Sequence, residues 1–473
     1  MNTLAQSIQT LRYPPAVQRR YFIHTFGCQM NESDSQRMGE ALARAGWSPT
    51  EAAESADLVL LNTCAIREKA EDKLFSALGR YRILKAQRGT RIGVAGCVAQ
   101  QEKEKLIQRA PFVDFVLGPD QLGRVAELAE KGGLETGWVP SEEYLFPQAD
   151  PQSSTGRATA FVTAMKGCDN VCSFCVVPYT RGREVSRPYP EIAREVAALV
   201  EVGIREVTLI GQNVNSYAGG CSFAELIRRV GAVPGLLRIR FTTSHPMDLS
   251  PELIACFDKA QGEPKLMPHF HLPVQHGADT VLERMRRKYT VAEYERRIGQ
   301  LFATRPEVAL TSDIICGFPG ETFAEHALNL ELLRRVPFDS LFSFIFSPRP
   351  HTGAVRKLEE WGEVPREVAL HRLDEVQALQ KSRTRALHES RIGTEVEVLV
   401  EHDDQAHRYG RSRENWAVRF LGDAKVGDLV RVRIEHAALV SLRGTQTAVV
   451  DPAPRTSRPA IAPKAMRLAV VSA

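Results

Sequence analysis

The sequence predicts an α/β protein with three folded parts: an N-terminal doubly wound parallel sheet, a central partial (β/α)6 barrel and a small C-terminal antiparallel β-barrel. Three observations lead to this prediction. Short apolar runs alternate with helix-like segments over residues 20–135, and the same alternation returns over residues 158–386. Residues 387–451 alternate apolar and polar side chains without helices. Alternation of strand and helix is typical of parallel sheets, whereas successive alternating strands favour an antiparallel barrel.

The composition is that of a globular protein, with 43% hydrophobic and 25% charged residues among 473. No run of 18 apolar residues occurs, and the first twenty residues lack the apolar core of a signal peptide, so we expect a cytoplasmic protein that does not enter a membrane. Nine cysteines are too few for a disulfide scaffold and favour metal binding or chemistry where they cluster. The net charge of +4 indicates no extended nucleic-acid surface, so any such surface must be local.

Four apolar runs predict the strands of the N-terminal sheet. They are "RYFIHTFGC" (20–28), "ADLVLLNTC" (56–64), "RIGVAGC" (91–97) and "FVDFVLGP" (112–119). Three of the runs end in a cysteine, namely Cys28, Cys64 and Cys97. The carboxyl ends of neighbouring parallel strands converge on one crevice, where ligands usually bind. A single cysteine of this kind is more often a small buried side chain than a ligand, but three at equivalent strand ends predict a shared site.

Six further apolar runs predict the central barrel, after a linker rich in Gly, Pro and Ser over residues 136–157. The runs occupy residues 158–168, 206–213, 237–246, 269–277, 308–321 and 339–350. Helical segments separate them, and in residues 189–203 the apolar face consists of Ile192, Val196, Leu199 and Val200. Six such units suit a partial barrel with its chemistry on the loops at the carboxyl ends of the strands.

A helical segment over residues 366–390 precedes the predicted C-terminal barrel. The barrel strands are expected in residues 394–401, 415–422, 427–437 and 439–450. The last residues, 452–473, contain four prolines and little apolar periodicity, so we expect them to be disordered.

The stretch "GCDNVCSFC", residues 167–175, brings Cys168, Cys172 and Cys175 close together, and no further Cys or His follows for over forty residues. A structural zinc ion takes four protein ligands, usually as paired C-x2-C or H-x3-H units, and only one such pair is present. Three thiolates instead suit a [4Fe-4S] cluster in which one iron has no protein ligand and can bind a small molecule. The zinc site remains the alternative.

The spacing C-x3-C-x2-C with Phe174 before the last cysteine resembles the signature of the radical S-adenosylmethionine (SAM) superfamily. The resemblance implies that SAM binds the open iron and is cleaved by one electron to methionine and a 5′-deoxyadenosyl radical. It also implies SAM contacts at the ends of the second and fifth barrel strands. The matching positions are Gly211, Gln212 and Asn213, and the segment "SDIICGFPGE" at residues 312–321.

Nearly the whole chain resembles the methylthiotransferases within that superfamily. The resemblance rests on "TFGCQMN", "LNTCAIREKA", "VAGCVAQ", "VVPYTRGRE", "GQNVNSY", "HLPVQ" and "SDIICGFPGET". It implies a second [4Fe-4S] cluster on Cys28, Cys64 and Cys97, and an RNA-binding TRAM-like, OB-like barrel at the C-terminus. One difference from the family pattern is "HLPVQHGAD", where His276 and Ala278 replace small hydroxyl residues.

The motifs "GCQMN", "VVPYTRGRE" and "GQNVNSY" are most similar to those of the bacterial tRNA enzymes of the family. That resemblance implies conversion of N6-isopentenyladenosine to 2-methylthio-N6-isopentenyladenosine at position 37, next to the anticodon. The six cysteines would be the catalytic and metal-binding residues, and the partners would be the tRNA anticodon stem-loop and an electron donor such as flavodoxin or ferredoxin. Three alternatives stay open: methylthiolation of a ribosomal-protein aspartate, of threonylcarbamoyladenosine in tRNA, or a non-catalytic, zinc-stabilised RNA-binding protein.

The remaining cysteines, and several histidines and arginines, are expected to have smaller roles. Cys256 and Cys316 are expected to pack in the core. Cys221 lies in a glycine-rich loop and is expected to have neither a packing role nor a chemical one. His269 and His271 alternate along one strand and are expected to point into the barrel. Arg181, Arg183 and Arg187 are expected either to hold phosphates at the barrel mouth or to form a solvated loop.

Overall fold

The computed structural model describes residues 19–65 and 68–454, and the chain divides into two compact units, Met1–Gly137 and Trp138–Ala473. The segment expected to be disordered lies outside the described residues from residue 455 onward. In the described ranges no helix combines the length and the apolar character that crossing a bilayer requires.

The first unit is built on a parallel sheet of six strands in the order β2-β1-β3-β4-β5-β6. The strands are β1 (Arg20–Thr25), β2 (Ser48–Pro49), β3 (Leu58–Thr63), β4 (Arg91–Gly96), β5 (Phe115–Leu117) and β6 (Gly133–Glu135). The helices are α1 (Gln29–Arg44), α2 (Glu68–Arg88), α3 (Cys97–Glu102), α4 (Glu104–Arg109) and α5 (Val125–Lys131). All four predicted strands are present, whereas the short β2 and β6 were not predicted because two or three residues carry no periodic pattern.

Strand β3 is buried on both faces, as expected for the middle of a doubly wound sheet. Leu58 and Leu60 point to one face and pack in a cluster that includes Met38 of α1 and Leu128 of α5. On β1, His24 hydrogen-bonds the hydroxyl of Tyr81 from α2 at 2.9 Å. Helices therefore pack against the sheet from both sides, and the predicted doubly wound fold is confirmed.

The second unit begins with six strands in two parallel sheets, β11-β10-β7 and β12-β13-β14. An isolated parallel bridge joins Ile239 of β11 to Leu266. The strands are β7 (Thr159–Thr163), β10 (Glu206–Ile210), β11 (Arg238–Phe241), β12 (His269–His271), β13 (Ala309–Cys316) and β14 (Ser340–Ile345). Each matches one predicted run, so the partial barrel is confirmed. A separate antiparallel pair, β8 (Met165–Lys166) and β9 (Val185–Ser186), frames the loop after β7.

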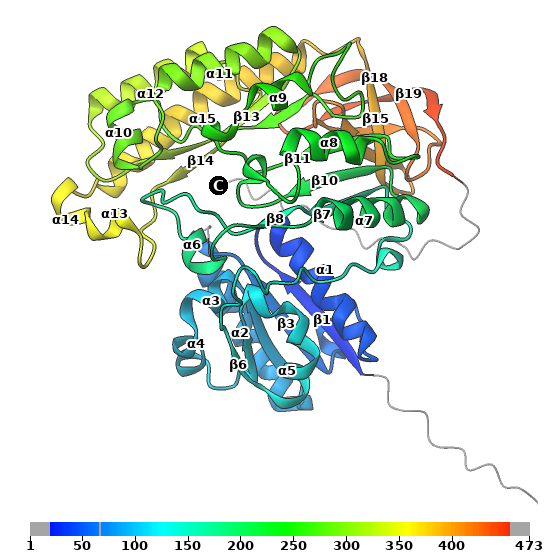
Figure 1. The fold of residues 1–473 in the computed structure, drawn as a ribbon, viewed down its shortest axis with the longest axis vertical. Helices are drawn as coiled ribbons and strands as arrows, with labels where there is room; N and C mark the ends of the chain where they lie inside the picture. The colour runs from blue at the N-terminus through cyan, green and yellow to red at the C-terminus, as the bar shows by residue number, and fades with distance from the viewer. Residues whose placement is uncertain (1–18, 66–67, 455–473) are drawn as a thin grey trace, which may run out of the picture. The chain divides into compact units, whose positions relative to one another are not determined.

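Helices cover the outer face of this partial barrel (Figure 1). The helices of this part of the chain are α6 (Val177–Thr180), α7 (Tyr189–Glu201), α8 (Phe223–Gly231), α9 (Pro251–Ala255), α10 (Asp279–Arg284), α11 (Val291–Thr304), α12 (Phe323–Arg335), α13 (Gly353–Arg356), α14 (Leu358–Trp361) and α15 (Arg366–Glu389), and α7, α8, α11, α12 and α15 belong to the outer layer. On α7 the predicted face is confirmed, since Ile192, Val196 and Leu199 are buried. Capping boxes at Thr290 and Thr322 begin α11 and α12 and satisfy their first amides.

The C-terminal strands close into a five-stranded barrel, β15-β16-β17-β19-β18. They are β15 (Glu395–Asp404), β16 (His407–Ser412), β17 (Ala417–Leu421), β18 (Leu429–Ala437) and β19 (Leu442–Asp451). The predicted barrel is confirmed, with two differences. β17 and β19 pair in parallel, and β16, with the polar sequence "HRYGRS", was not predicted.

The C-terminal barrel and the partial barrel pack together through buried arginines on β11. Arg240 donates from Nη2 to the carbonyl of Ser412 at 2.7 Å, and Arg238 donates from Nη2 to Oε1 of Glu397 at 3.0 Å. Glu206 on β10 accepts from Nε of Arg240 at 2.8 Å. These three residues are nearly inaccessible to solvent. These buried polar contacts form the interface between the two barrels, which belong to one compact unit. That residues 387–451 form an independent domain stays a prediction.

Candidate functional site

The first cysteine trio follows three neighbouring strands of the N-terminal sheet. Cys28, Cys64 and Cys97 come directly after or within three residues of the ends of β1, β3 and β4. Thr25 pairs with Asn62 and Thr63 pairs with Gly96, so the three strands end at the same level. Cys64 and Cys97 are buried, and Cys28 is partly exposed. The three residues therefore lie at one edge of the sheet, as predicted.

Two glycines let the loops of this edge approach one another. Gly27 has φ of 143°, and a Cβ there would collide with Cβ of Cys64. Gly96 has φ of 93°, and a Cβ there would collide with the side chain of Asn62 and the carbonyl of Thr63. Only glycine fits both requirements, because other residues rarely adopt these angles and would fill the space.

Two buried asparagines join the same loops, a role that sequence reasoning missed. The Cys28 thiol donates to Oδ1 of Asn31 at 3.3 Å, and Nδ2 of Asn31 donates to Oδ1 of Asn62 at 3.0 Å and to the carbonyl of Thr63 at 3.1 Å. Asn62 returns a bond to the carbonyl of Asn31 at 2.8 Å. Both stand in the motifs "GCQMN" and "LNTC", three and two residues from a cysteine, and that proximity was the available signal.

The second trio lies on the loop between β8 and α6. The amide of Cys168 donates to the carbonyl of Gly182 at 3.2 Å, and the amide of Cys175 donates to the carbonyl of Cys172 at 3.1 Å. Burial raises the pKa of Cys168 to about 11, and burial together with the charge of Cys172 raises the pKa of Cys175 to about 12. The surroundings therefore favour neutral thiols until a cation compensates the thiolate charge.

The loop is fixed from its two sides by the partial barrel. Ser173 donates from its amide to the carbonyl of Met285 at 3.0 Å and from its hydroxyl to the carbonyl of Arg284 at 2.7 Å. Gln212 accepts at Oε1 from the amide of Gly167 at 2.5 Å. The buried Arg287 donates from Nη1 to Sγ of Cys172 at 3.4 Å. Burial opposes the charge of Arg287, but Tyr289 and Cys172 raise the pKa of its guanidinium above the ordinary range.

The three residues predicted to contact SAM after β10 have defined partners. A Cβ at Gly211 would collide with the side chain of Met165, so the glycine permits close packing there. Gln212 supports the cysteine loop as described above. Asn213 donates from Nδ2 to Asp248 at 2.8 Å, while its buried Oδ1 has no hydrogen-bond partner among the described residues. Their contacts with SAM stay a prediction.

The segment after β13 is held by Glu321, whose side chain is fully buried. Its Oε2 accepts from the amides of Gly317 and Phe318, and its Oε1 lies 3.4 Å from Nε2 of His276 and 3.5 Å from Nδ1 of His326. Burial would raise the pKa of Glu321, but the two histidines, together with Arg372, lower it to about 2. The histidine that departs from the family pattern therefore contacts the predicted SAM-binding loop.

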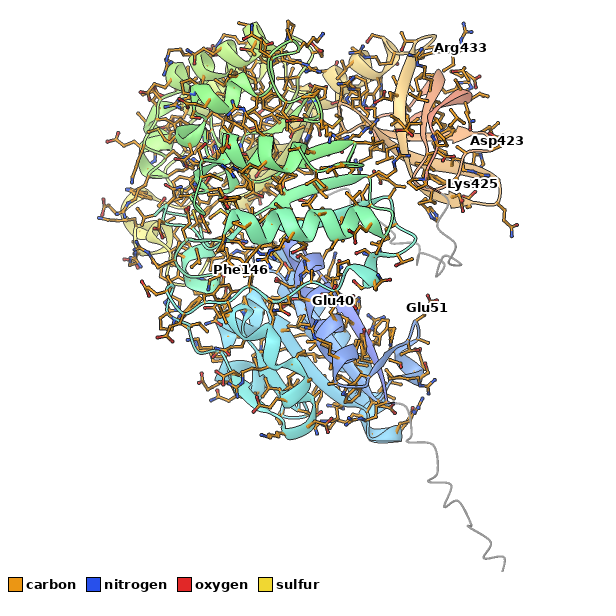
Figure 2. All side chains as sticks on the ribbon, turned by 45° about the vertical axis from the view of Figure 1, so that its right-hand side comes forward. Glu40, Glu51, Phe146, Asp423, Lys425 and Arg433 are labelled. Carbon is orange, nitrogen blue, oxygen red and sulfur yellow. The ribbon has the colours of Figure 1, made fainter. Side chains whose placement is uncertain are left out.

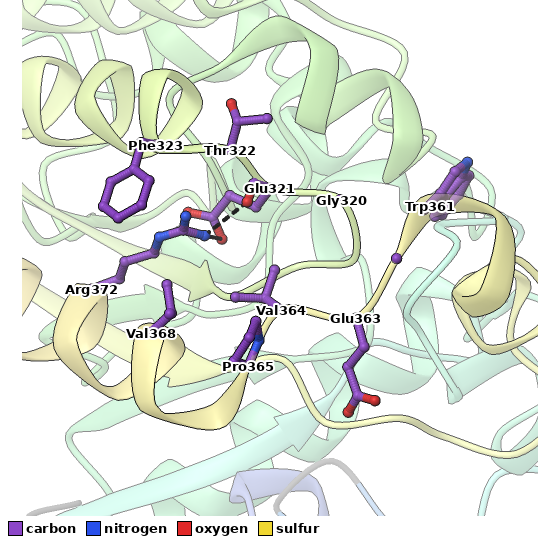
Figure 3. Close-up of a pocket in the computed structure, with 11 residues that line it drawn as sticks. Gly320, Glu321, Thr322, Phe323, Trp361, Glu363, Val364, Pro365, Val368 and Arg372 are labelled. Atoms are coloured by element: carbon purple, nitrogen blue, oxygen red, sulfur yellow. Dashed lines mark hydrogen bonds and ion pairs between the residues drawn. The ribbon is translucent and has the colours of Figure 1, made fainter.

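A pocket of about 400 Å³ adjoins the same segment (Figure 3). Glu321 and Arg372 face each other in it, between the start of α12 and the start of α15. None of the six cysteines lines the pocket. It therefore borders the predicted SAM-binding loop without including the cysteine sites.

The inner face of β12, β13 and β14 carries polar and aromatic side chains. His271 contacts the hydroxyl of Thr311 at 3.0 Å, lies 3.6 Å from Asp313 and meets the ring of Phe342 edge-on at 5.9 Å between centroids. Phe342 and Phe344 are 56% and 45% exposed, on the side of β14 opposite Leu341 and Ile345, which pack on the helical core. This concave wall thus offers apolar surface beside hydrogen-bonding groups.

Other residues singled out in the sequence have structural surroundings. Cys256 and Cys316 are fully buried, which confirms their predicted packing role. The buried Arg187 pairs with Glu195 at 2.5 Å and with Glu191 at 3.3 Å, which satisfies its charge within the fold and makes the phosphate role wrong for this residue. Arg183 is exposed and pairs with Asp169 at 2.9 Å.

The ligand chemistry of the two cysteine trios, and the close packing of the loops that carry the first one, fit iron-sulfur clusters. Each trio presents only thiol ligands, and the absence of a side chain at Gly27 and Gly96 lets the loops of the first trio approach one another. Among the described residues no three Cys, His, Asp or Glu side chains converge as the ligands of one metal ion would. Thiolates of a cluster bind different irons, so they stand further apart than the ligands of a single ion.

Comparisons with known proteins cover both trios. The model of an uncharacterized protein family, UPF0004, matches residues 20–118, and the model of the radical SAM superfamily matches residues 162–333. A protein of Anaeromyxobacter sp. (strain Fw109-5) named tRNA-2-methylthio-N(6)-dimethylallyladenosine synthase is 58% identical, over 91% of this chain and 96% of its own. A protein of the same name from Myxococcus xanthus (strain DK1622) is 55% identical, over 92% of this chain and 95% of its own.

Among solved structures, the chain is similar to TsrM of Kitasatospora setae, a radical SAM methyltransferase with cobalamin and a [4Fe-4S] cluster bound. The TM-score is 0.53 at 14% sequence identity, with 72% of this chain and 78% of that chain covered. At this identity the similarity concerns the fold.

Proposed function

Because the chain belongs to the family of tRNA-2-methylthio-N(6)-dimethylallyladenosine synthases, which are radical SAM enzymes, we propose that it methylthiolates tRNA. The substrate is N6-isopentenyladenosine at position 37, next to the anticodon, and the product carries a methylthio group at C2 of the base. This C2–H bond is not acidic, so side chains acting as acids or bases have little to offer. When bound, two [4Fe-4S] clusters and SAM supply the radical and sulfur chemistry that the reaction requires.

The observation that carries the proposal is the presence of two cysteine trios, one at the carboxyl ends of three parallel strands and one on the single loop that follows β7 and β8. Cys168, Cys172 and Cys175 would hold the cluster that binds SAM, and Cys28, Cys64 and Cys97 would hold the cluster that carries sulfur. The chain's other residues set the positions of these loops. Gln212 and Ser173 fix the loop of Cys168, Cys172 and Cys175 to the barrel, while Asn31 and Asn62 join the loops that carry Cys28 and Cys64.

The inner wall formed by β12, β13 and β14 suits the modified adenosine. Phe342 and Phe344 offer exposed apolar surface of the kind that an isopentenyl group buries. Asp313, Thr311 and His271 offer donors and acceptors on the same face for the purine edge. Exposed aromatic side chains beside polar groups are typical of sites that recognise single bases in RNA.

The C-terminal barrel supplies a surface for the RNA backbone, as the TRAM-like assignment implies. Arg431 and Arg433 on β18 alternate with buried Val432 and Ile434, and Arg443 on the adjacent β19 is also exposed. Figure 2 shows Arg433 projecting from this barrel. Arginines on one face bind phosphates without reading sequence, so they would position the tRNA.

A one-electron donor such as flavodoxin or ferredoxin is part of the proposal, because cleaving SAM consumes an electron that the chain cannot generate. A cytoplasmic location is also part of it, because the tRNA substrate is found there. Both rest on the family chemistry.

The decisive experiment is a reaction of anaerobically purified protein with SAM, reductant and isopentenylated tRNA, read by nucleoside mass spectrometry. We expect the 2-methylthio product, and about eight iron and eight sulfide per chain. Cys221→Ala is the matched control, because this cysteine belongs to neither trio, and it should keep both values. About two zinc ions without labile sulfide would support the non-catalytic alternative instead. Modification only of threonylcarbamoyladenosine, or of a ribosomal-protein aspartate, would reassign the substrate.

A further inference from the structure

Arg287 lies on the loop between α10 and α11 and is 4% exposed. Its side chain has three partners. Nε donates to the hydroxyl of Tyr289 at 2.9 Å, Nη2 donates to the carbonyl of Pro273 at 2.9 Å, and Nη1 donates to Sγ of Cys172 at 3.4 Å. The guanidinium is therefore locked in one orientation, with one donor aimed at a cysteine of the second trio.

The neighbours of Arg287 are unusual for a buried cation. In the part of the chain that the structure describes, its hydrogen bonds reach a hydroxyl, a carbonyl and a sulfur atom, and none reaches a carboxylate. A buried charge without an opposite charge is strongly disfavoured. A thiolate at Cys172 would supply that charge. The site is thus completed electrostatically when Cys172 is a metal ligand.

We infer that Arg287 is a positioning residue that sets the reduction potential of the cluster on Cys168, Cys172 and Cys175. The inference rests on the proposed function, since it requires that cluster. Reduction adds one electron, taken from a low-potential one-electron donor, and so adds one negative charge. A hydrogen bond from a cation to a ligand sulfur stabilises the more negative state, and hydrogen bonds to the sulfurs are among the factors that set cluster potentials. Arg287 therefore makes the cluster easier to reduce.

The test is a redox titration of the holoenzyme, followed by electron paramagnetic resonance with dithionite and mediator dyes. The signal that changes when SAM is added identifies the cluster that binds SAM, and the other cluster is the internal reference. In Arg287→Gln we expect the equilibrium constant for reducing the SAM-sensitive cluster to fall at least tenfold. The midpoint potential of its signal should therefore become more negative by ~59 mV or more, for a one-electron step. The reference midpoint should not move.

Two further variants make the result specific. Arg286→Gln removes an exposed charge one residue away and should leave both midpoints unchanged. Tyr289→Phe removes the hydroxyl that holds Nε of Arg287 and should shift the SAM-sensitive midpoint in the same direction by a smaller amount. If Arg287→Gln does not retain the cluster, the titration of Tyr289→Phe decides the matter. An unshifted midpoint in the cluster-bearing variant overturns the inference, whereas wild-type protein without a SAM-sensitive signal would instead contradict the proposed function.

Discussion

Replacing Arg240 with alanine should weaken the second unit far more than replacing an exposed arginine, because Arg240 joins the two barrels from a buried position. Its side chain is 4% exposed and makes three bonds: to Glu206 at 2.8 Å, to the carbonyl of Ser412 at 2.7 Å and to the carbonyl of Arg413 at 3.0 Å. Glu206 is equally buried. Without Arg240, the one cation that stays within ion-pair distance of this carboxylate in the described part of the chain is Arg238, at 3.8 Å.

The expected loss in the free energy of unfolding is ~3–5 kcal/mol, the usual cost of removing one partner of a buried ion pair. That is a large part of the ~5–15 kcal/mol by which domains are stable. The matched control is Arg335→Ala. Arg335 is half-exposed and pairs with Glu295 at 2.9 Å, so its removal should cost less than ~1 kcal/mol.

The assay is urea unfolding of the reconstituted protein under anaerobic conditions, followed by circular dichroism. A double variant, Glu206→Gln with Arg240→Met, should recover part of the loss, since it removes both charges together. Equal losses for Arg240→Ala and Arg335→Ala would refute the reasoning, and so would a double variant less stable than Arg240→Met alone. Either result would mean that the two barrels do not depend on the buried charges.

Three further outcomes follow from the site and the core. Cys172→Ala should abolish 5′-deoxyadenosine formation, whereas Cys64→Ala should still form it under strong reductant but yield no methylthiolated tRNA; chromatography of the products checks both, and the opposite result would exchange the two clusters. Phe342→Ala should weaken binding of an isopentenylated anticodon stem-loop about tenfold or more, from ~1.5–3 kcal/mol of lost apolar burial, while an unmodified stem-loop serves as control; equal weakening of both would place the isopentenyl group elsewhere. Burial raises the pKa of Asp339 from 3.8, its ordinary value in the unfolded chain, to about 6 in the folded protein. The folded state therefore binds this proton more tightly, and the stabilisation that results is fully present below about pH 4 and is lost as the pH rises through about 6. The unfolding free energy of the wild type relative to Asp339→Asn should therefore fall between about pH 4 and pH 6, and a constant difference across that window in urea titrations would contradict it.

The periodic segments of the chain were readable without the structure, because a strand or helix that buries one face repeats its apolar residues locally. The six strands of the partial barrel, the four main strands of the N-terminal sheet and the apolar face of α7 were all predicted in this way. The strand-end positions of Cys28, Cys64 and Cys97 followed from the same patterns. β16 was missed because "HRYGRS" has no apolar alternation and becomes a strand through the hydrogen bonds of its neighbours.

The surroundings of the candidate site were decided by the tertiary structure. Arg240 and Arg287 look like surface residues in the sequence, yet both are buried, because residues far along the chain supply their acceptors. Gln212 was expected to contact SAM, and the structure adds a bond to the amide of Gly167, 45 residues earlier in the sequence. Local patterns determine which segments form strands and where cysteines follow them. Whether a charged or amide side chain can be buried depends on partners that only the folded chain brings within hydrogen-bond distance, since an unpaired polar group in the interior costs more free energy than its packing returns.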